Sequence, residues 1–272
     1  MSEVPSERED GGGIEIGQII DSYCASVDRE LAARLDGWPP DFAQIHVHEV
    51  VGAMLARQAT LAKDVACAPA MWTGHGAPIL LRAMADVYIN IAWLLLDPVD
   101  RCRKFILFGL GQAKLELEHR RAQIGAREPT PQELAMLESG ESWIDSQRIG
   151  SLLDVDLGKW SSLSVRQMAM EAGCIDFYNY VYAPFSACAH SMWHHIARYN
   201  LRKCSNPLHR HHRRPTSETF APDIYYLTLA AKYWSKTIGT FDRTYGLEIS
   251  GPPSYETLLD VVTDGSGDLH PA

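Results

Sequence analysis

The feature that most constrains the fold is one apolar stretch, His75 to Leu96, which carries three polar residues at regular spacing. Arg82, Asp86 and Asn90 follow one another at intervals of four residues. On a helix this spacing places them about one turn apart along one edge, so an otherwise apolar helix would carry a single polar stripe. Such a helix is normally buried, and a buried charge is costly unless it is paired. The stripe therefore predicts either an internal structural ion pair or the wall of a polar site.

The rest of the chain shows helical periodicity and capping signals, without the alternation typical of strands. Further helices are predicted at residues 14–35, 41–67, 99–124, after the capping box at 130–133, at 164–173, at 176–203 with a kink at Pro184, and at 223–245. Residues 139–163 and 204–222 are expected to be connections. The sequence thus predicts an all-α protein, a single helical bundle of about six to seven helices over residues 14–246, with disordered termini at 1–13 and 247–272.

Composition limits the classes of function. A net charge of -9 argues against a surface that coats nucleic acid broadly, although a local basic patch remains compatible with it. The longest strongly apolar run, Ile89 to Leu96, is too short to span a bilayer, and the N-terminus lacks the order of a secretory signal. The six cysteines are scattered, with no C-x-x-C pair, which favours reduced thiols over disulfides or a zinc knuckle. We therefore expect a cytoplasmic protein that does not enter a membrane.

A second polar stripe lies in the predicted helix at residues 176–203. Tyr182, Ser186 and His190 occupy successive turns of one face, and His194 extends the row with some drift. Polar groups on two apolar, buried helices need hydrogen-bond partners, and each stripe can provide them for the other. We therefore expect Arg82 and Asp86 to approach Tyr182, Ser186 or His190.

The polar seam that these two facing stripes would form has a catalytic and a structural interpretation. His190, oriented by Asp86, could act as a general base, and Arg82 could stabilise a developing anion such as a pentacovalent phosphate. Ser186 beside His190 is a weaker candidate nucleophile, because no G-x-S-x-G motif is present. Alternatively the residues are structural: Asp86 forms an ion pair with Arg82 or His190, and the hydroxyl groups form hydrogen bonds with neighbouring residues.

Two segments together resemble the bacterial family of unknown function DUF5677. The first runs from Leu55 to Phe105 and contains R-x-x-x-D at residues 82–86; the second runs from Lys159 to His195 and contains Y-x-x-x-S-x-x-x-H at residues 182–190. This chain has Asp86 where the family pattern usually has Glu. The resemblance implies an all-helical, cytoplasmic protein, and some relatives resemble the nucleic-acid-cleaving toxins and defence proteins called HEPN.

HEPN ribonucleases carry an R-x(4-6)-H motif, and one match runs from Arg202 to His209 across an Asn-Pro pair. It leads into the one concentrated basic run, HRHHRR. This run is either a solvated loop without a binding role or a binding site for the phosphates of RNA, of a nucleotide or of a partner. The candidate phosphate-binding residues are Arg202, His209, Arg210, His211, His212, Arg213 and Arg214.

A metal site is the remaining alternative. His190 and His194 have the spacing that lets two imidazoles reach one ion, and His46, His48 or Glu49 could complete the site between helices. No H-E-x-x-H pattern reinforces them, so we expect no metal and no other cofactor, with a divalent metal on His190 and His194 as the alternative.

The function expected from this pattern is that of a HEPN-like protein of defence or toxin type, including antiviral defence, which acts on RNA or a nucleotide phosphate as a ribonuclease or other phosphoester-cleaving hydrolase. A non-catalytic sensor or assembly module with a structural seam is the alternative, and a metal-dependent helical-bundle enzyme is the third. RNA or a nucleotide is the expected partner, and a homodimer or a protein partner stays open.

Overall fold

The computed structural model describes residues 16–147 and 161–265, and it confirms the predicted all-α class. Its longer helices are α1 (Ile16–Gly37), α2 (Ile45–Ala66), α3 (Ala77–Leu94), α4 (Pro98–Ile124), α5 (Pro131–Ser146), α10 (Tyr225–Tyr245) and α11 (Ser254–Gly265). The shorter ones are α6 (Val165–Glu171), α7 (Ile175–Phe177), α8 (Ala183–Ala189) and α9 (Trp193–Tyr199), with a π-helical turn at Tyr178–Tyr182 and 3-10 turns at Phe42–Gln44 and Pro69–Met71. Two short strands, β1 (Leu201–Lys203) and β2 (Arg213–Pro215), form one antiparallel hairpin.

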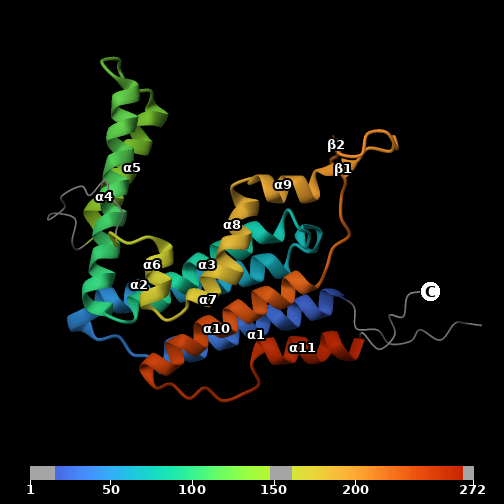
Figure 1. Cartoon of the computed structure of the whole chain (residues 1–272). Helices are drawn as coiled ribbons and strands as arrows, with labels where there is room; N and C mark the ends of the chain where they lie inside the picture. The colour runs from blue at the N-terminus through green and yellow to red at the C-terminus, as the bar shows by residue number, and fades with distance from the viewer. Residues whose placement is uncertain (1–15, 148–160, 266–272) are drawn as a thin grey trace, which may run out of the picture.

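Helix α3 lies at the centre of the bundle, with α2 and α10 packed against it on one side and α6 and α8 on the other (Figure 1). Most of its apolar residues are buried, among them Leu81, Met84 and Ile89, which are fully covered. By length and composition α3 could also cross a membrane, but 67% of that window is buried inside the bundle. Burial of this kind is typical of the core helix of a globular domain.

Helices α1, α10 and α11 form the face of the bundle opposite α8, and polar contacts connect them. Arg34 of α1 makes a bidentate pair with Asp242 of α10, at 2.9 and 2.6 Å. Glu30 accepts hydrogen bonds from the indole of Trp234 at 2.6 Å and from the backbone N–H of Ser254 at 2.8 Å. The first turn of α11 is therefore anchored by a carboxylate from α1.

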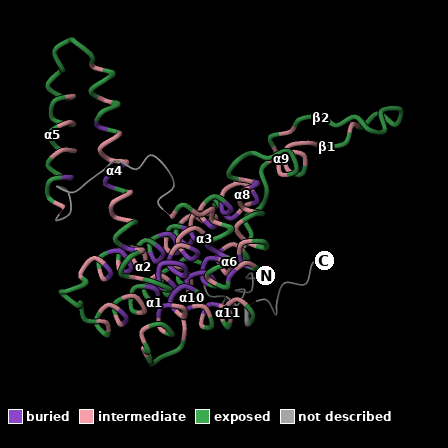
Figure 2. The backbone as a smooth tube through the Cα atoms, turned by 60° about the vertical axis from the view of Figure 1, so that its left-hand side comes forward, coloured by how far each residue is buried: buried purple, intermediate pink, exposed green. Residues whose placement is uncertain are grey.

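Helices α4 and α5 form an arm that leaves the bundle, and most of its surface is exposed (Figures 1 and 2). The capping box predicted at Thr130 and Glu133 is present and starts α5. Leu117 and Ile144 are the buried contacts between the two helices. The end of α4 is largely exposed, and α5 extends into the stretch 139–163 expected to be a connection.

The helix predicted over residues 176–203 is divided into several pieces. Pro184 lies in the first turn of α8, where its missing N–H costs nothing, and the π-helical turn precedes it. The main break comes later, because Ser191 has a left-handed φ of 49°. The N–H groups of Ser191 and Met192 bond to the carbonyls of Cys188 and Ala187, which is the Schellman pattern that ends a helix.

The chain after residue 203 also corrects two expectations. The segment 204–222 is not a plain loop, because β1 and β2 pair Leu201 with Pro215 and Lys203 with Arg213. The segment 247–272 is not disordered throughout, because α11 occupies part of it, packed on α1 and α10. The expectation of disorder at 1–13 lies outside the described residues.

Candidate functional site

The two predicted polar stripes meet between α3 and α8. Nε of Arg82 donates a hydrogen bond to Oγ of Ser186 at 2.8 Å, and its guanidinium lies 3.4 Å from the centre of the Tyr182 ring. Arg82 also forms an ion pair with Asp86, one turn further along α3. The expected approach of the stripes is therefore confirmed for Arg82, Tyr182 and Ser186. We call Arg82, Asp86, Tyr182 and Ser186 the seam.

The seam is partly buried, and this burial shifts the pKa values of its groups. The side chain of Arg82 is only 13% exposed and that of Asp86 is 40% exposed. Burial raises the pKa of the Asp86 carboxyl, although the charge of Arg82 acts in the opposite direction. Burial also raises the pKa of Tyr182, and the charge of Asp86 adds to this effect. Arg82 thus opposes the effect of burial on the pKa of Asp86.

His190 and Asn90 lie apart from the seam. His190 ends α8 and is exposed, and among the described residues no hydrogen bond or ion pair joins it to Asp86. Asn90 is half-buried on α3, and within the same described ranges no hydrogen bond connects it to Arg82 or Asp86. The predicted pairing of His190 with Asp86 is therefore not seen among the described residues, because the Schellman turn ends α8 at His190.

A pocket of about 760 Å³ opens beside the seam. Tyr182 and Ser186 of the seam line it, together with Gly74 and Pro78 at the start of α3 and Tyr226 at the start of α10. Further polar lining comes from α9, which contributes His194, His195, Arg198 and Tyr199, and from Asn179 in the π-helical turn. Aromatic rings, imidazoles and one guanidinium thus surround a space large enough for a nucleotide-sized ligand.

Close packing fixes the α9 side of the pocket. His195 contacts Tyr199 and His75, with ring centroids 4.7 and 5.4 Å apart. A Cβ atom on Gly74 would lie 2.5 Å from the Tyr199 ring, so only glycine admits this approach. The thiol of Cys188 donates to the carbonyl of His75 at 3.5 Å and thereby connects α8 to the same turn.

Burial lowers the pKa of His195, and the nearby charges of His75 and His194 lower it further. The imidazole is therefore neutral near pH 7 and has a free nitrogen that can accept a proton. This property is what a general base requires.

Most of the pocket is not predicted by the sequence. Helical spacing points to His194 only as an extension of the second polar stripe and as a candidate metal ligand, and it does not single out His195, Arg198, Tyr199 or Tyr226. The signal for His195 and Arg198 is their three-residue spacing within WHHIARY, which places them on one face of a helix. Tyr226 comes from a distant helix, and no local pattern could have revealed it.

The basic run occupies the hairpin that follows α9 directly and projects from the bundle (Figure 2). Arg202 lies on β1 and forms an ion pair with Glu218, whereas His209 lies in the loop. The R-x(4-6)-H match therefore joins a strand to a loop. The other candidate phosphate-binding residues, His209, Arg210, His211, His212, Arg213 and Arg214, are all exposed.

The structure does not favour the metal pair suggested by helical spacing. His190 and His194 belong to different helices, because the chain turns at Ser191 between them. Within the described ranges, the group of three or more His, Cys, Asp or Glu side chains close enough to share an ion is Cys204, His209 and His212 in the hairpin.

Comparison with known proteins identifies a family. The model of a family of unknown function, DUF5677, matches residues 48–206, more than half of the chain, including the seam and α9. No curated protein and no solved structure matches.

Proposed function

Because the chain belongs to the family of unknown function DUF5677, whose match includes the seam and α9, we propose that this region is the working part of the protein. It binds RNA or a nucleotide phosphate in the pocket and cleaves a phosphoester there. The biological setting is the one implied by the resemblance to HEPN proteins, a defence- or toxin-type role in the cytoplasm.

The observation that carries the proposal is the composition of the pocket walls. Tyr199 and Tyr226 offer aromatic faces on which a base can stack. Arg198 offers a guanidinium that fits the geometry of a phosphate, and it is exposed enough to reach one. His195 supplies a neutral imidazole in the same pocket. Aromatic and cationic groups in one pocket are the combination that single-stranded nucleic acid requires.

The residues support cleavage by transfer of two protons. His195 takes the proton from a ribose 2′-hydroxyl, and the 2′-oxygen then forms a bond to the neighbouring phosphorus. Arg198 compensates the negative charge that develops on the phosphate oxygens. The bond from phosphorus to the 5′-oxygen breaks, and His194 donates a proton to the leaving oxygen. The products are a 2′,3′-cyclic phosphate and a 5′-hydroxyl.

In this scheme the seam positions the pocket wall and does not react. Arg82 holds Ser186 by a hydrogen bond and Tyr182 by stacking, and both of these residues line the pocket. A guanidinium that contacts two neighbouring turns of the chain fixes how they lie on α3.

Cleavage of a short fluorescent RNA by the full-length protein tests the proposal. We expect His195→Ala to lower the rate by about 100-fold or more while the melting temperature stays near that of the wild type. Arg103→Ala is the matched control for Arg198→Ala, because Arg103 is exposed on α4 and does not line the pocket. An RNA that lacks the 2′-hydroxyl at the cleaved position should bind and remain intact. Wild-type protein that neither binds nor cleaves RNA or nucleotides would contradict the proposal.

The second candidate is a non-catalytic sensor or assembly module, and the contacts of Arg82 favour it. The guanidinium is engaged by Asp86, Ser186 and Tyr182 at once, as in a structural cross-link. Under this alternative the wild type binds a nucleotide or RNA but releases it unchanged. The change His195→Ala would then alter affinity without altering any rate of cleavage.

A further inference from the structure

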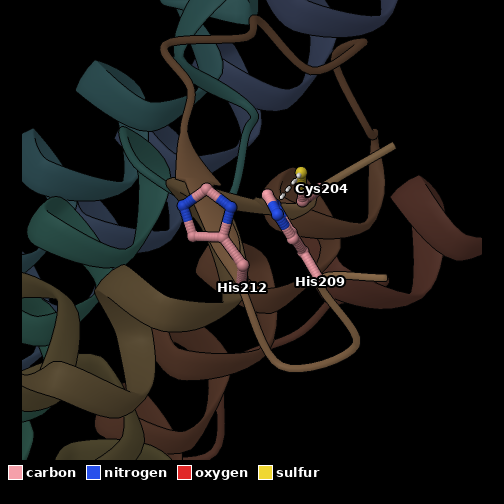
Figure 3. A group of neighbouring side chains, drawn as sticks. All are labelled: Cys204, His209 and His212. Carbon is pink, nitrogen blue, oxygen red and sulfur yellow. Dashed lines mark hydrogen bonds between the residues drawn. The ribbon is translucent and has the colours of Figure 1, made fainter. Parts of the chain in front are cut away.

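We propose that Cys204, His209 and His212 form a zinc site in the loop between β1 and β2. The ligand atoms of these three side chains all lie within 4.8 Å of one another. Figure 3 shows the His209 ring beside the sulfur of Cys204, joined to it by a dashed line, with the His212 ring near them. One thiolate and two imidazoles are a donor set that zinc prefers.

The distances are close to those that a tetrahedral ion requires. Sγ of Cys204 lies 3.7 Å from Nδ1 of His209. In a tetrahedral site with ordinary zinc–sulfur and zinc–nitrogen bonds, two such ligand atoms are about 3.6 Å apart. The ligand nitrogen of His212 lies within 4.8 Å of the ligand atoms of both other residues, and its ring centroid lies 5.6 Å from that of His209.

The backbone already brings the ligands together. The N–H of Cys204 bonds to the carbonyl of His212 at 3.1 Å, which closes the loop at its base. Two further backbone bonds, from His209 to Asn206 and from His212 to His209, both 3.0 Å, turn the chain within it. The amide of Asn206 lies 3.4 Å from Nε2 of His209, on the side of the ring away from the sulfur. A site ordered in this way loses little conformational entropy when an ion binds.

Burial of apolar side chains does not hold this loop in place. Every residue from 205 to 215 is exposed, so the loop has no apolar core of its own. Small segments without a core are commonly held by a metal or a disulfide. Lys203, Arg210, Arg213 and Arg214 surround the site with positive charge, which a thiolate ligand partly offsets. With three protein ligands the ion keeps one position open for water or another ligand.

Titration of the full-length, tag-free protein with Co²⁺ tests the site, because tetrahedral Co²⁺ reports its ligands by visible absorption. We expect one equivalent of Co²⁺ to bind with a sulfur-to-cobalt charge-transfer band, and Zn²⁺ to displace it. Cys204→Ser should abolish that band. His209→Ala and His212→Ala should each weaken Zn²⁺ binding by more than about 10-fold, since even changes outside the ligand shell cost that much.

His211→Ala is the matched control, because His211 lies in the same loop but outside the ligand group. It should bind Zn²⁺ as the wild type does. Two results would overturn the proposal: binding without a charge-transfer band, or equal losses in His211→Ala and His209→Ala, which would mean diffuse binding to a histidine-rich loop. Circular dichroism of each variant shows whether the bundle is folded, so weaker binding can be assigned to the site.

Discussion

At the scale of single residues, Arg82 connects α3 to Ser186 of α8 by a hydrogen bond and to Tyr182 of the π-helical turn by stacking. Its replacement by Met removes the hydrogen bond to Ser186 and leaves Asp86, whose pKa burial raises, without its cation. We expect Arg82→Met to lower the free energy of unfolding by about 1–3 kcal/mol, as measured by urea denaturation.

His190→Ala serves as the comparison for this change. His190 is exposed and, among the described side chains, has no ion pair, so its removal should alter the free energy of unfolding by less than about 0.5 kcal/mol. Equal losses in the two variants would show that the seam contributes nothing particular to the stability of the bundle.

His195 makes stability depend on pH in a defined direction. Its pKa in the folded protein lies below the ordinary value of 6.5, so the unfolded chain binds more protons than the folded one as the pH falls. The stabilisation is therefore present above pH 6.5 and is lost as the pH falls through the pKa of the folded state. Melting temperatures measured between about pH 5 and 8 should fall more steeply with acid in the wild type than in His195→Gln. Parallel curves would contradict this assignment.

At the scale of elements, local signals predict the helices well where capping or periodicity is strong. The apolar stretch around Arg82 forms α3, and the capping box at Thr130 starts α5. The prediction of one long helix at 176–203 is wrong, because the chain turns at Ser191, which adopts the left-handed conformation. Such a turn usually has a glycine, and this stretch has none, so the sequence does not indicate the helix end.

Tertiary contacts explain the elements that the sequence does not reveal. Helix α11 depends on Glu30, which lies far away in the chain and accepts hydrogen bonds at the first turn of α11. The pocket likewise combines α8, α9, the turn at Gly74 and the start of α10. One stripe of the site could be predicted from helical spacing, but the partners from distant elements could not.

The end of α8 gives an element-scale prediction. A non-glycine residue in the left-handed region costs about 1–2 kcal/mol, and glycine avoids this cost. Ser191→Gly should therefore raise the free energy of unfolding, by up to about 1 kcal/mol once the greater freedom of the unfolded chain is subtracted. The same change at Ser205, an exposed residue of the hairpin loop whose φ is not left-handed, should not stabilise the protein. A destabilised Ser191→Gly variant would show that the Schellman turn is held by other means.

At the scale of the whole molecule, the segment next to the site is positively charged, whereas the chain as a whole is negatively charged. The chain carries a net charge of -9, yet Arg198 and the exposed arginines of the hairpin lie along one continuous segment after α8. Under the proposed function, RNA enters along this segment. Its affinity should fall as salt rises, and replacing Arg210, Arg213 and Arg214 by Gln should reduce the logarithmic salt slope by about 0.7 for each phosphate that the variant no longer neutralises. An unchanged slope would place the RNA elsewhere.

Fluorescence anisotropy with a short RNA made uncleavable by 2′-O-methyl groups tests whether RNA is bound in the pocket. It compares the wild type with Tyr199→Ala and Arg198→Ala, which change the pocket, and with Arg103→Ala on α4, which does not. We predict that each pocket variant binds about 10-fold more weakly or worse, since Tyr199→Ala loses stacking that contributes about 1–3 kcal/mol per base and Arg198→Ala loses a phosphate contact. Arg103→Ala should bind as the wild type does. Equal affinity in all four proteins would contradict the claim that RNA is bound in this pocket.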